Sequence, residues 1–171
     1  MTLRNLSLLF ISLFILAACG GGGGGSTTPP TAGCSPSTTN LCITVVGGKY
    51  VVQNSSSAGV SQKTLTLNAG TYTFDQTDSS NVTPAGAYGS ARIHQIGFST
   101  TSDGTFGGGS TYSTGVNTSG SPGSNGKTTI VIDASTPSTL YYYCVNHRGM
   151  GGRINIVIGN QSDQVEFTET N

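Results

Sequence analysis

The chain has 171 residues, a formal net charge of zero and only 8% charged residues. A chain of this length forms about one domain, and it lacks the basic stripe that nucleic acids or anionic surfaces attract. We therefore expect one folded unit and no nucleic-acid partner. Glycine, serine, threonine and asparagine dominate the composition. The apolar residues nevertheless gather in short alternating runs, which indicates strands rather than a disordered chain.

The N-terminal residues have the features of an export signal. Arg4 precedes an apolar run, residues 6–18, that is short for a membrane span. The run ends in Leu-Ala-Ala directly before Cys19, an arrangement that resembles the bacterial lipobox, in which the cysteine is diacylated and becomes the first mature residue. We expect a lipoprotein signal peptide over residues 1–18 and a lipid on Cys19. The alternatives are an ordinary signal peptide with a chance cysteine, or a buried helix.

The expected lipid would make the bilayer a partner of the chain, because several acyl chains together hold a protein firmly. Gly20, not an aspartate, follows Cys19, which favours the outer membrane. We expect a protein of the bacterial cell envelope that is lipid-anchored and faces the periplasm or lies on the outer membrane. The Gly-, Ser-, Thr- and Pro-rich residues 19–40 are typical of a tether.

The four cysteines are Cys19, Cys34, Cys42 and Cys144. Cys34 and Cys42 close a short loop, and a disulfide between them is expected in an oxidising compartment. Both could instead be free thiols, or one could pair with Cys144. With the favoured pairing Cys144 is left alone, and a thiol outside the cytoplasm is a liability unless something occupies it.

Alternating apolar residues predict a β-sandwich of seven or eight strands in a domain over residues 41–160, followed by a C-terminal tail at 161–171. No segment has a sustained helical period, and the Gly-rich residues 101–126 have no assigned role. The strand candidates are residues 41–46, 50–53, 63–67, 72–74, 93–99, 128–133, 139–145 and 153–158.

The chain has two histidines, His94 and His147, and one methionine besides the initiator, Met150. Cys144, His147 and Met150 follow one another as C-x2-H-x2-M between the last two strand candidates. Thiolate, imidazole and thioether together suit copper in both oxidation states, and two histidines and a cysteine with a distant methionine make a blue-copper site. Zinc prefers another cysteine, histidine or carboxylate to a thioether, and the C-x-x-C-H motif of haem attachment is absent.

The final hairpin resembles that of the cupredoxins, the type 1 blue copper proteins of the amicyanin, plastocyanin and pseudoazurin group. The ligand spacing is closest to the short loop of amicyanin. The resemblance implies a Greek-key β-sandwich with one type 1 copper ion at one end. The first histidine ligand of the family comes earlier in the chain, where Ile93-His94-Gln95-Ile96 has the general shape, and no other histidine is left for the role.

The resemblance implies a role for each ligand. Cys144 supplies the thiolate that gives the colour, His94 and His147 complete the plane, and Met150 is the weak axial ligand. Four protein ligands leave no open position for a substrate, so we expect a monomeric one-electron carrier and not an enzyme. An unidentified redox protein would dock near His147. The alternatives are a copper-binding or delivery protein, and a metal-free structural or adhesion module.

Overall fold

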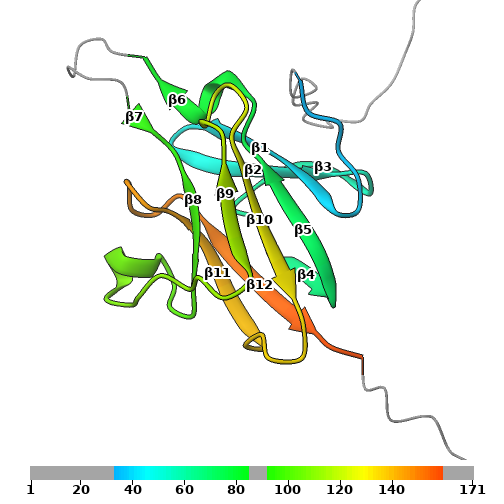
Figure 1. Cartoon of the computed structure of the whole chain (residues 1–171). Coiled ribbons are helices and arrows are strands. Elements are labelled where there is room, and N and C mark those ends of the chain that lie inside the picture. Colours follow the sequence, from blue (N-terminus) through cyan, green and yellow to red (C-terminus); the bar gives the residue numbers. More distant parts are fainter. Residues whose placement is uncertain (1–32, 85–91, 160–171) are drawn as a thin grey trace, which may run out of the picture.

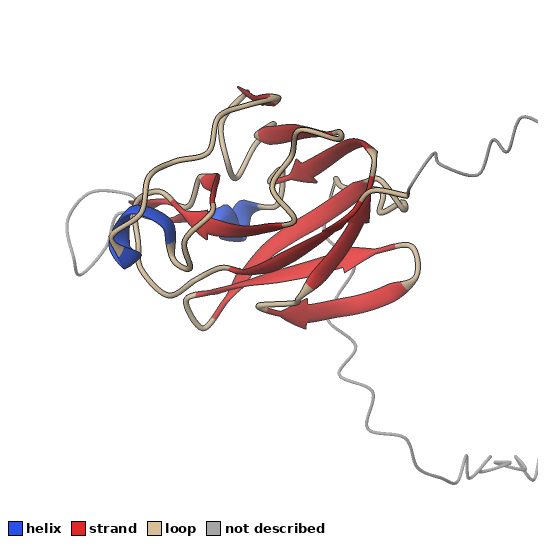
Figure 2. Ribbon diagram, turned by 90° about the horizontal axis from the view of Figure 1, so that it is seen from below, coloured by secondary structure: helices blue, strands red, loops and turns tan. Residues whose placement is uncertain are grey.

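A computed structural model describes residues 33–84 and 92–159. The predicted signal peptide, the predicted lipidation at Cys19, most of the predicted tether and the tail lie outside these residues. The described chain is an all-β sandwich, as the sequence predicts (Figures 1 and 2). None of its helices has the length and apolar character needed to cross a bilayer.

The described residues form twelve strands and two short 3-10 helices. They are β1 (Asn40–Val46), β2 (Lys49–Asn54), β3 (Ser57–Ser61), β4 (Leu65–Asn68), β5 (Gly70–Asp75), η1 (Ser79–Asn81), β6 (Val82–Thr83), β7 (Arg92–Ile93), β8 (Ile96–Ser99), η2 (Gly104–Gly107), β9 (Val116–Ser119), β10 (Lys127–Ile132), β11 (Thr139–Cys144) and β12 (Gly152–Val157). Strands β3, β6 and β9 have no counterpart among the strand candidates, because they are short or polar and lack a clear alternation. The candidate at 93–99 is divided into β7 and β8, with His94 and Gln95 between them.

The strands form two main sheets and a small ribbon. The larger sheet has the order β3-β2-β1-β5-β10-β9, and the smaller one has the order β4-β12-β11-β8. The pairs β1–β5 and β12–β4 are parallel, whereas the remaining pairs are antiparallel. The ribbon β6–β7 lies at one end of the sandwich, at the upper left of Figure 1.

The core lies between the two sheets. The alternation of side chains along each strand explains which residues enter it. Ile130 and Ile132 in β10 are buried, whereas Val131 between them is 43% exposed, because successive side chains of a strand point to opposite faces. Phe74 of one sheet meets Phe98 of the other edge-on, with ring centroids 5.1 Å apart. Aromatic pairs in this geometry add to the stabilisation that burial alone provides.

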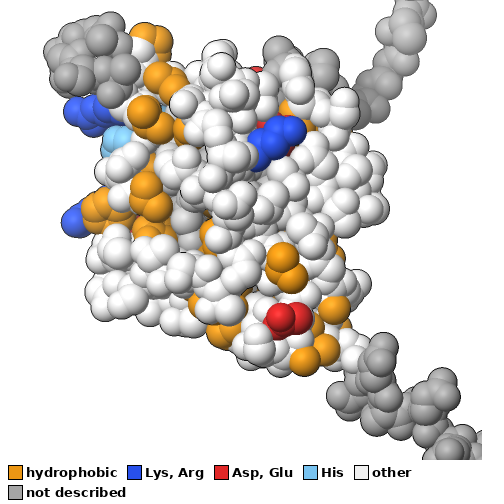
Figure 3. Space-filling view, viewed as in Figure 1, with side chains coloured by type: hydrophobic (Ala, Val, Ile, Leu, Met, Phe, Trp, Pro, Cys, Tyr) orange, Lys and Arg blue, Asp and Glu red, His pale blue; other side chains and the backbone are white. Residues whose placement is uncertain are grey.

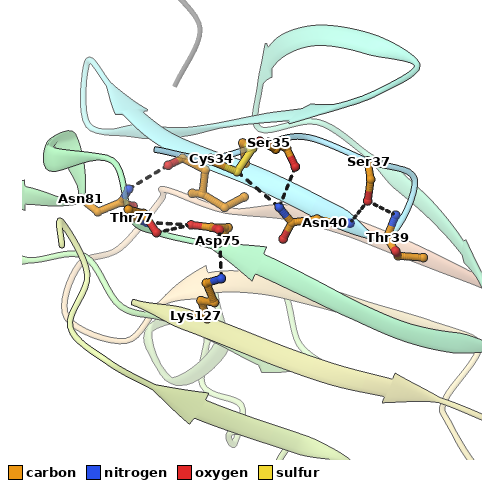
Figure 4. Close-up of a disulfide and its surroundings, with 11 residues drawn as sticks. Cys34, Ser35, Ser37, Thr39, Asn40, Asp75, Thr77, Asn81 and Lys127 are labelled. Atoms are coloured by element: carbon orange, nitrogen blue, oxygen red, sulfur yellow. Dashed lines mark hydrogen bonds and ion pairs between the residues drawn. A yellow bond between two sulfur atoms is a disulfide. The ribbon is translucent and has the colours of Figure 1, made fainter. Parts of the chain in front are cut away.

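A disulfide between Cys34 and Cys42 fastens the residues before β1 to that strand (Figure 4). Asn40 supports it by donating to the Ser35 carbonyl at 2.9 Å and to the Cys34 sulfur at 3.5 Å. Ser37 caps the same turn by accepting from the backbone N–H of Asn40 at 2.8 Å. In the chain-entropy view, closing so short a loop contributes about 2.5 kcal/mol of stability.

The Gly-rich residues 101–126 are folded against the sandwich. Strand β9 adds to the edge of the larger sheet beside β10, and Tyr112 bridges to Phe98. Gly104 lies so close to the ring of Tyr143 that an added Cβ would be 2.4 Å from a ring carbon. Its φ of +54° is also one that side chains rarely adopt. This position therefore needs glycine, and the segment that the sequence leaves without a role covers the end of β11.

Candidate metal centre

Three strands and the loops at their ends bring together three of the four predicted ligands, His94, Cys144 and His147. Cys144 is the last residue of β11, His147 lies in the loop that follows, and His94 lies between β7 and β8. Strands β8 and β11 pair antiparallel with Ile96 opposite Cys144. This register places His94 beside Cys144, although 50 residues separate them in the sequence.

The two histidines present the same ring atom to the cysteine. The Nδ1 atom of His147 is 3.4 Å from the Cys144 sulfur, and the Nδ1 atom of His94 is 4.0 Å from it. One ligand atom from each of the three residues lies within 4.8 Å of the others. Around one metal ion with M–S of about 2.3 Å and M–N of about 2.0–2.1 Å, such atoms are roughly 3.3–3.8 Å apart. The group therefore has the size of a metal site.

Burial of these residues also suits a metal centre. Cys144 is fully buried and His94 is 6% exposed, whereas His147 is half-buried. Cys144 is the one free cysteine among those that the structure describes. Met150 is 2% exposed and belongs to the same apolar cluster as Cys144. Thiolate and imidazole in this number can hold a metal ion, and they do not by themselves fix which one.

His94 is held so that its Nδ1 faces the sulfur. Its Nε2 lies 3.0 Å from the hydroxyl of Thr83 in β6. A hydrogen on Nε2 would donate to this hydroxyl and leave the Nδ1 lone pair free for a metal, which is how a second partner commonly orients a ligating histidine. Burial, followed by the charges of His147 and Arg92, lowers the pKa of His94 below its ordinary value. This favours the neutral ring, the form that binds metals.

A buried polar network holds the backbone of His94. Its N–H donates to the carbonyl of Asn81 at 2.9 Å, and its carbonyl accepts from the Tyr50 hydroxyl at 2.9 Å and from the Gln76 side-chain amide. Gln76 also donates to the side chain of Asn81 at 3.0 Å. The described residues contain no buried side-chain N or O atom without a partner. Sequence reasoning missed all of these supports, because nothing in their local pattern marks them.

The loop between Cys144 and β12 is fastened from three directions. The N–H of Gly149 donates to Asp103 at 2.7 Å, and its carbonyl accepts from Lys49. Gln62 donates to the Gly151 carbonyl at 2.8 Å. Among the described non-glycine residues, Gln62 and Asp103 alone have positive φ, +48° and +59°. Backbone strain of this kind often accompanies functional sites, and here both residues hold the ligand loop.

Three exposed apolar side chains lie next to ligand-bearing segments: Ile93 precedes His94, Val145 follows Cys144, and Phe106 contacts Arg148, which follows His147. Ile93, Val145 and Phe106 are 45%, 38% and 38% exposed. The guanidinium of Arg148 lies 5.8 Å from the centre of the Phe106 ring. Figure 3 shows hydrophobic and basic side chains beside a histidine on this face. The surface next to the metal group is therefore apolar with positive charge at its edge.

Comparison of the chain with known protein families and with curated proteins finds no match. The metal group itself consequently carries the functional argument.

Proposed function

We propose that this chain is a type 1 copper protein that carries single electrons. His94, Cys144 and His147 would be the three strong ligands, and Met150 the weak axial one. The observation that carries the proposal is the buried, unpaired Cys144 with the Nδ1 atoms of two histidines at 3.4 and 4.0 Å. A β-sandwich with this cluster at one end is compatible with a cupredoxin.

The donor set favours copper over zinc. One thiolate and two imidazoles with a nearby thioether form the combination found in blue-copper electron-transfer sites. Met150 follows His147 by three residues and is buried in the same apolar cluster as Cys144, which is why we assign it the axial position. When bound, copper would supply one-electron chemistry, and the same four residues would hold it in both oxidation states.

The surrounding residues would keep water away from the metal and limit the movement of its ligands. Apolar side chains exclude water from Cys144, and the hydrogen bonds on His94 limit the movement of its ring. A ligand frame that hardly moves lowers the cost of rearrangement when charge changes. The half-buried His147 lies closest to solvent, so its ring edge offers the shortest path for an electron to a partner docked on Ile93, Val145 and Phe106.

A lipid on Cys19 would place this domain in the bacterial cell envelope, on a tether that spans residues 19–40. The carrier would be a monomer that meets an unidentified redox protein at the His147 surface. A disulfide between Cys34 and Cys42 supports an oxidising compartment. It also leaves Cys144 as the thiol available to a metal.

The test is a titration of the detergent-solubilised full-length chain with Cu(II). We expect one equivalent to bind and give an intense blue or green colour, and the Cys144→Ser variant to stay colourless. Reversible one-electron voltammetry would then separate a carrier from a delivery protein. Wild-type protein that takes up no copper, or that binds Zn(II) with preference over copper under competition, would contradict the proposal.

A further inference from the structure

We infer that Tyr50 is a positioning residue that holds both ligand-bearing segments of the metal centre to strand β2. Its hydroxyl sets where the His94 segment lies relative to Cys144. The inference rests on the proposed copper function, and it concerns a residue that contributes no metal ligand.

Tyr50 contacts the site through both its backbone and its side chain. Its N–H donates to the Met150 carbonyl at 2.9 Å, and its own carbonyl accepts from the Gln62 N–H at 2.8 Å. Its hydroxyl donates to the His94 carbonyl at 2.9 Å. One fully buried residue therefore connects the first histidine segment with the loop that ends in Met150.

The links are long in sequence and short in space. The hydroxyl bond spans 44 residues. Gln62, bonded to the Tyr50 carbonyl, in turn donates to Gly149 and Gly151 on either side of Met150, at 3.2 and 2.8 Å. A displacement of Tyr50 would thus move both the His94 segment and the loop around Met150. Hydrogen bonds made in a site of low dielectric are stronger than those exposed to water.

The chain contains a matched control in Tyr142. This tyrosine is also fully buried, and its hydroxyl also donates to a backbone carbonyl, that of Lys63 at 2.8 Å. The two rings pack against each other with centroids 6.4 Å apart. The Tyr142 bond ends on a residue outside the ligand segments, whereas the Tyr50 bond ends on a ligand itself.

Gln76 makes the Tyr50→Phe variant informative. The His94 carbonyl also accepts from the Gln76 amide, so loss of the phenol leaves this buried carbonyl with a partner. Because a buried acceptor left without any partner is what costs most, we expect Tyr50→Phe to fold. The same substitution at Tyr142 removes the only side-chain donor that the described residues place on the Lys63 carbonyl.

The experiment compares wild type, Tyr50→Phe and Tyr142→Phe as full-length, copper-loaded proteins. For Tyr50→Phe we expect a shifted thiolate-to-copper absorption band and a change of about threefold or more in the ratio of Cu(I) to Cu(II) affinity, the scale of one net hydrogen bond. Tyr142→Phe should keep the wild-type band and ratio. A Tyr50→Phe protein with wild-type spectrum and ratio would overturn the inference, and so would equal shifts in both variants.

A second measurement works without copper. The rings of His94 and His147 have centroids 4.7 Å apart, which is close enough for proton–proton NOEs in the metal-free protein. Loss of these NOEs in Tyr50→Phe and their retention in Tyr142→Phe would support positioning by Tyr50, whereas retention in both would contradict it. If wild type binds no copper, the proposed function fails while this measurement still decides on Tyr50.

Discussion

The two ends of strand β11 are built in different ways. At its first end, the turn before Thr139 is closed locally: Asp133 accepts from Ser135 and Thr136, two and three residues away. At its last end, the segments around Cys144 are also joined by bonds that span 44 to 100 residues, such as Tyr50 to His94 and Lys49 to Gly149. The turn at the first end can be formed by its own sequence, whereas the metal end needs segments that are far apart in the chain.

The two ends also differ in backbone strain, which lies at the metal end. Gln62 and Asp103, both with positive φ, contact the loop at the metal end. A left-handed backbone at a non-glycine residue costs about 1–2 kcal/mol. The rest of the sandwich must offset this cost.

The largest expected effect is a loss of stability at the first end of β11 that leaves copper binding at the last end unchanged. Leu140 is fully buried near the start of β11, and Leu140→Ala should lower the free energy of unfolding by about 2–5 kcal/mol. Its folded fraction should keep the wild-type copper spectrum. Cys144→Ala should abolish the colour while removing only a small side chain from the core. Thermal unfolding and copper titration of both variants measure this, and loss of copper binding by folded Leu140→Ala would contradict it.

A second prediction concerns the glycine that closes the metal end. Gly104→Ala places a Cβ against the Tyr143 ring at a φ of +54°, and we expect it to cost about 1–3 kcal/mol through overpacking and strain. The matched control is Gly48→Ala, which has a φ of +72° but no atom within 4 Å of the added Cβ. Denaturant unfolding should show the larger loss for Gly104→Ala. Equal losses would mean that the contact with Tyr143 does not matter.

Loss of the hydrogen bond between the Gly149 N–H and Asp103 should have a smaller effect on stability. Asp103→Ala removes the acceptor for the Gly149 N–H and should cost about 1 kcal/mol. It should also speed the release of copper to a chelator, because the loop that carries His147 and Met150 is held less firmly. Asp103→Asn keeps an oxygen at the same place and should restore most of the wild-type release rate. A release rate unchanged in both variants would show that this hydrogen bond does not act on the site.

The same contrast shows how far the sequence can predict this protein. Strands such as β10 and β12 follow from alternation, and Cys144, His147 and Met150 follow from one local spacing. His94 came from a general shape and from the lack of another histidine, and the structure brings it beside Cys144. Thr83, Tyr50 and Gln76 could not be predicted, because their bonds to His94 depend on the packing of distant segments. A hydroxyl or amide in a strand or loop carries no mark of such a partner.

The smallest expected effect lies at the local end and depends on pH. Hydrogen bonds from Ser135, and then from Thr136, lower the pKa of Asp133 below its ordinary value. The folded protein therefore binds this proton less readily than the unfolded chain, whose aspartates titrate near about 3.9. The resulting stability is fully present above that pH and is lost as the pH falls through the lower folded value.

Asp133→Asn tests whether this turn acts through its charge. Asparagine keeps an acceptor oxygen but not the carboxylate, so the melting temperature should fall slightly at pH 6, and its difference from wild type should shrink as the pH is lowered below about 3.9. A difference that stays constant as the pH falls would assign the effect to the geometry of the turn. The copper spectrum at pH 6 should be identical in both proteins, because the turn lies at the opposite end of β11 from Cys144 and its bonds reach no further than three residues.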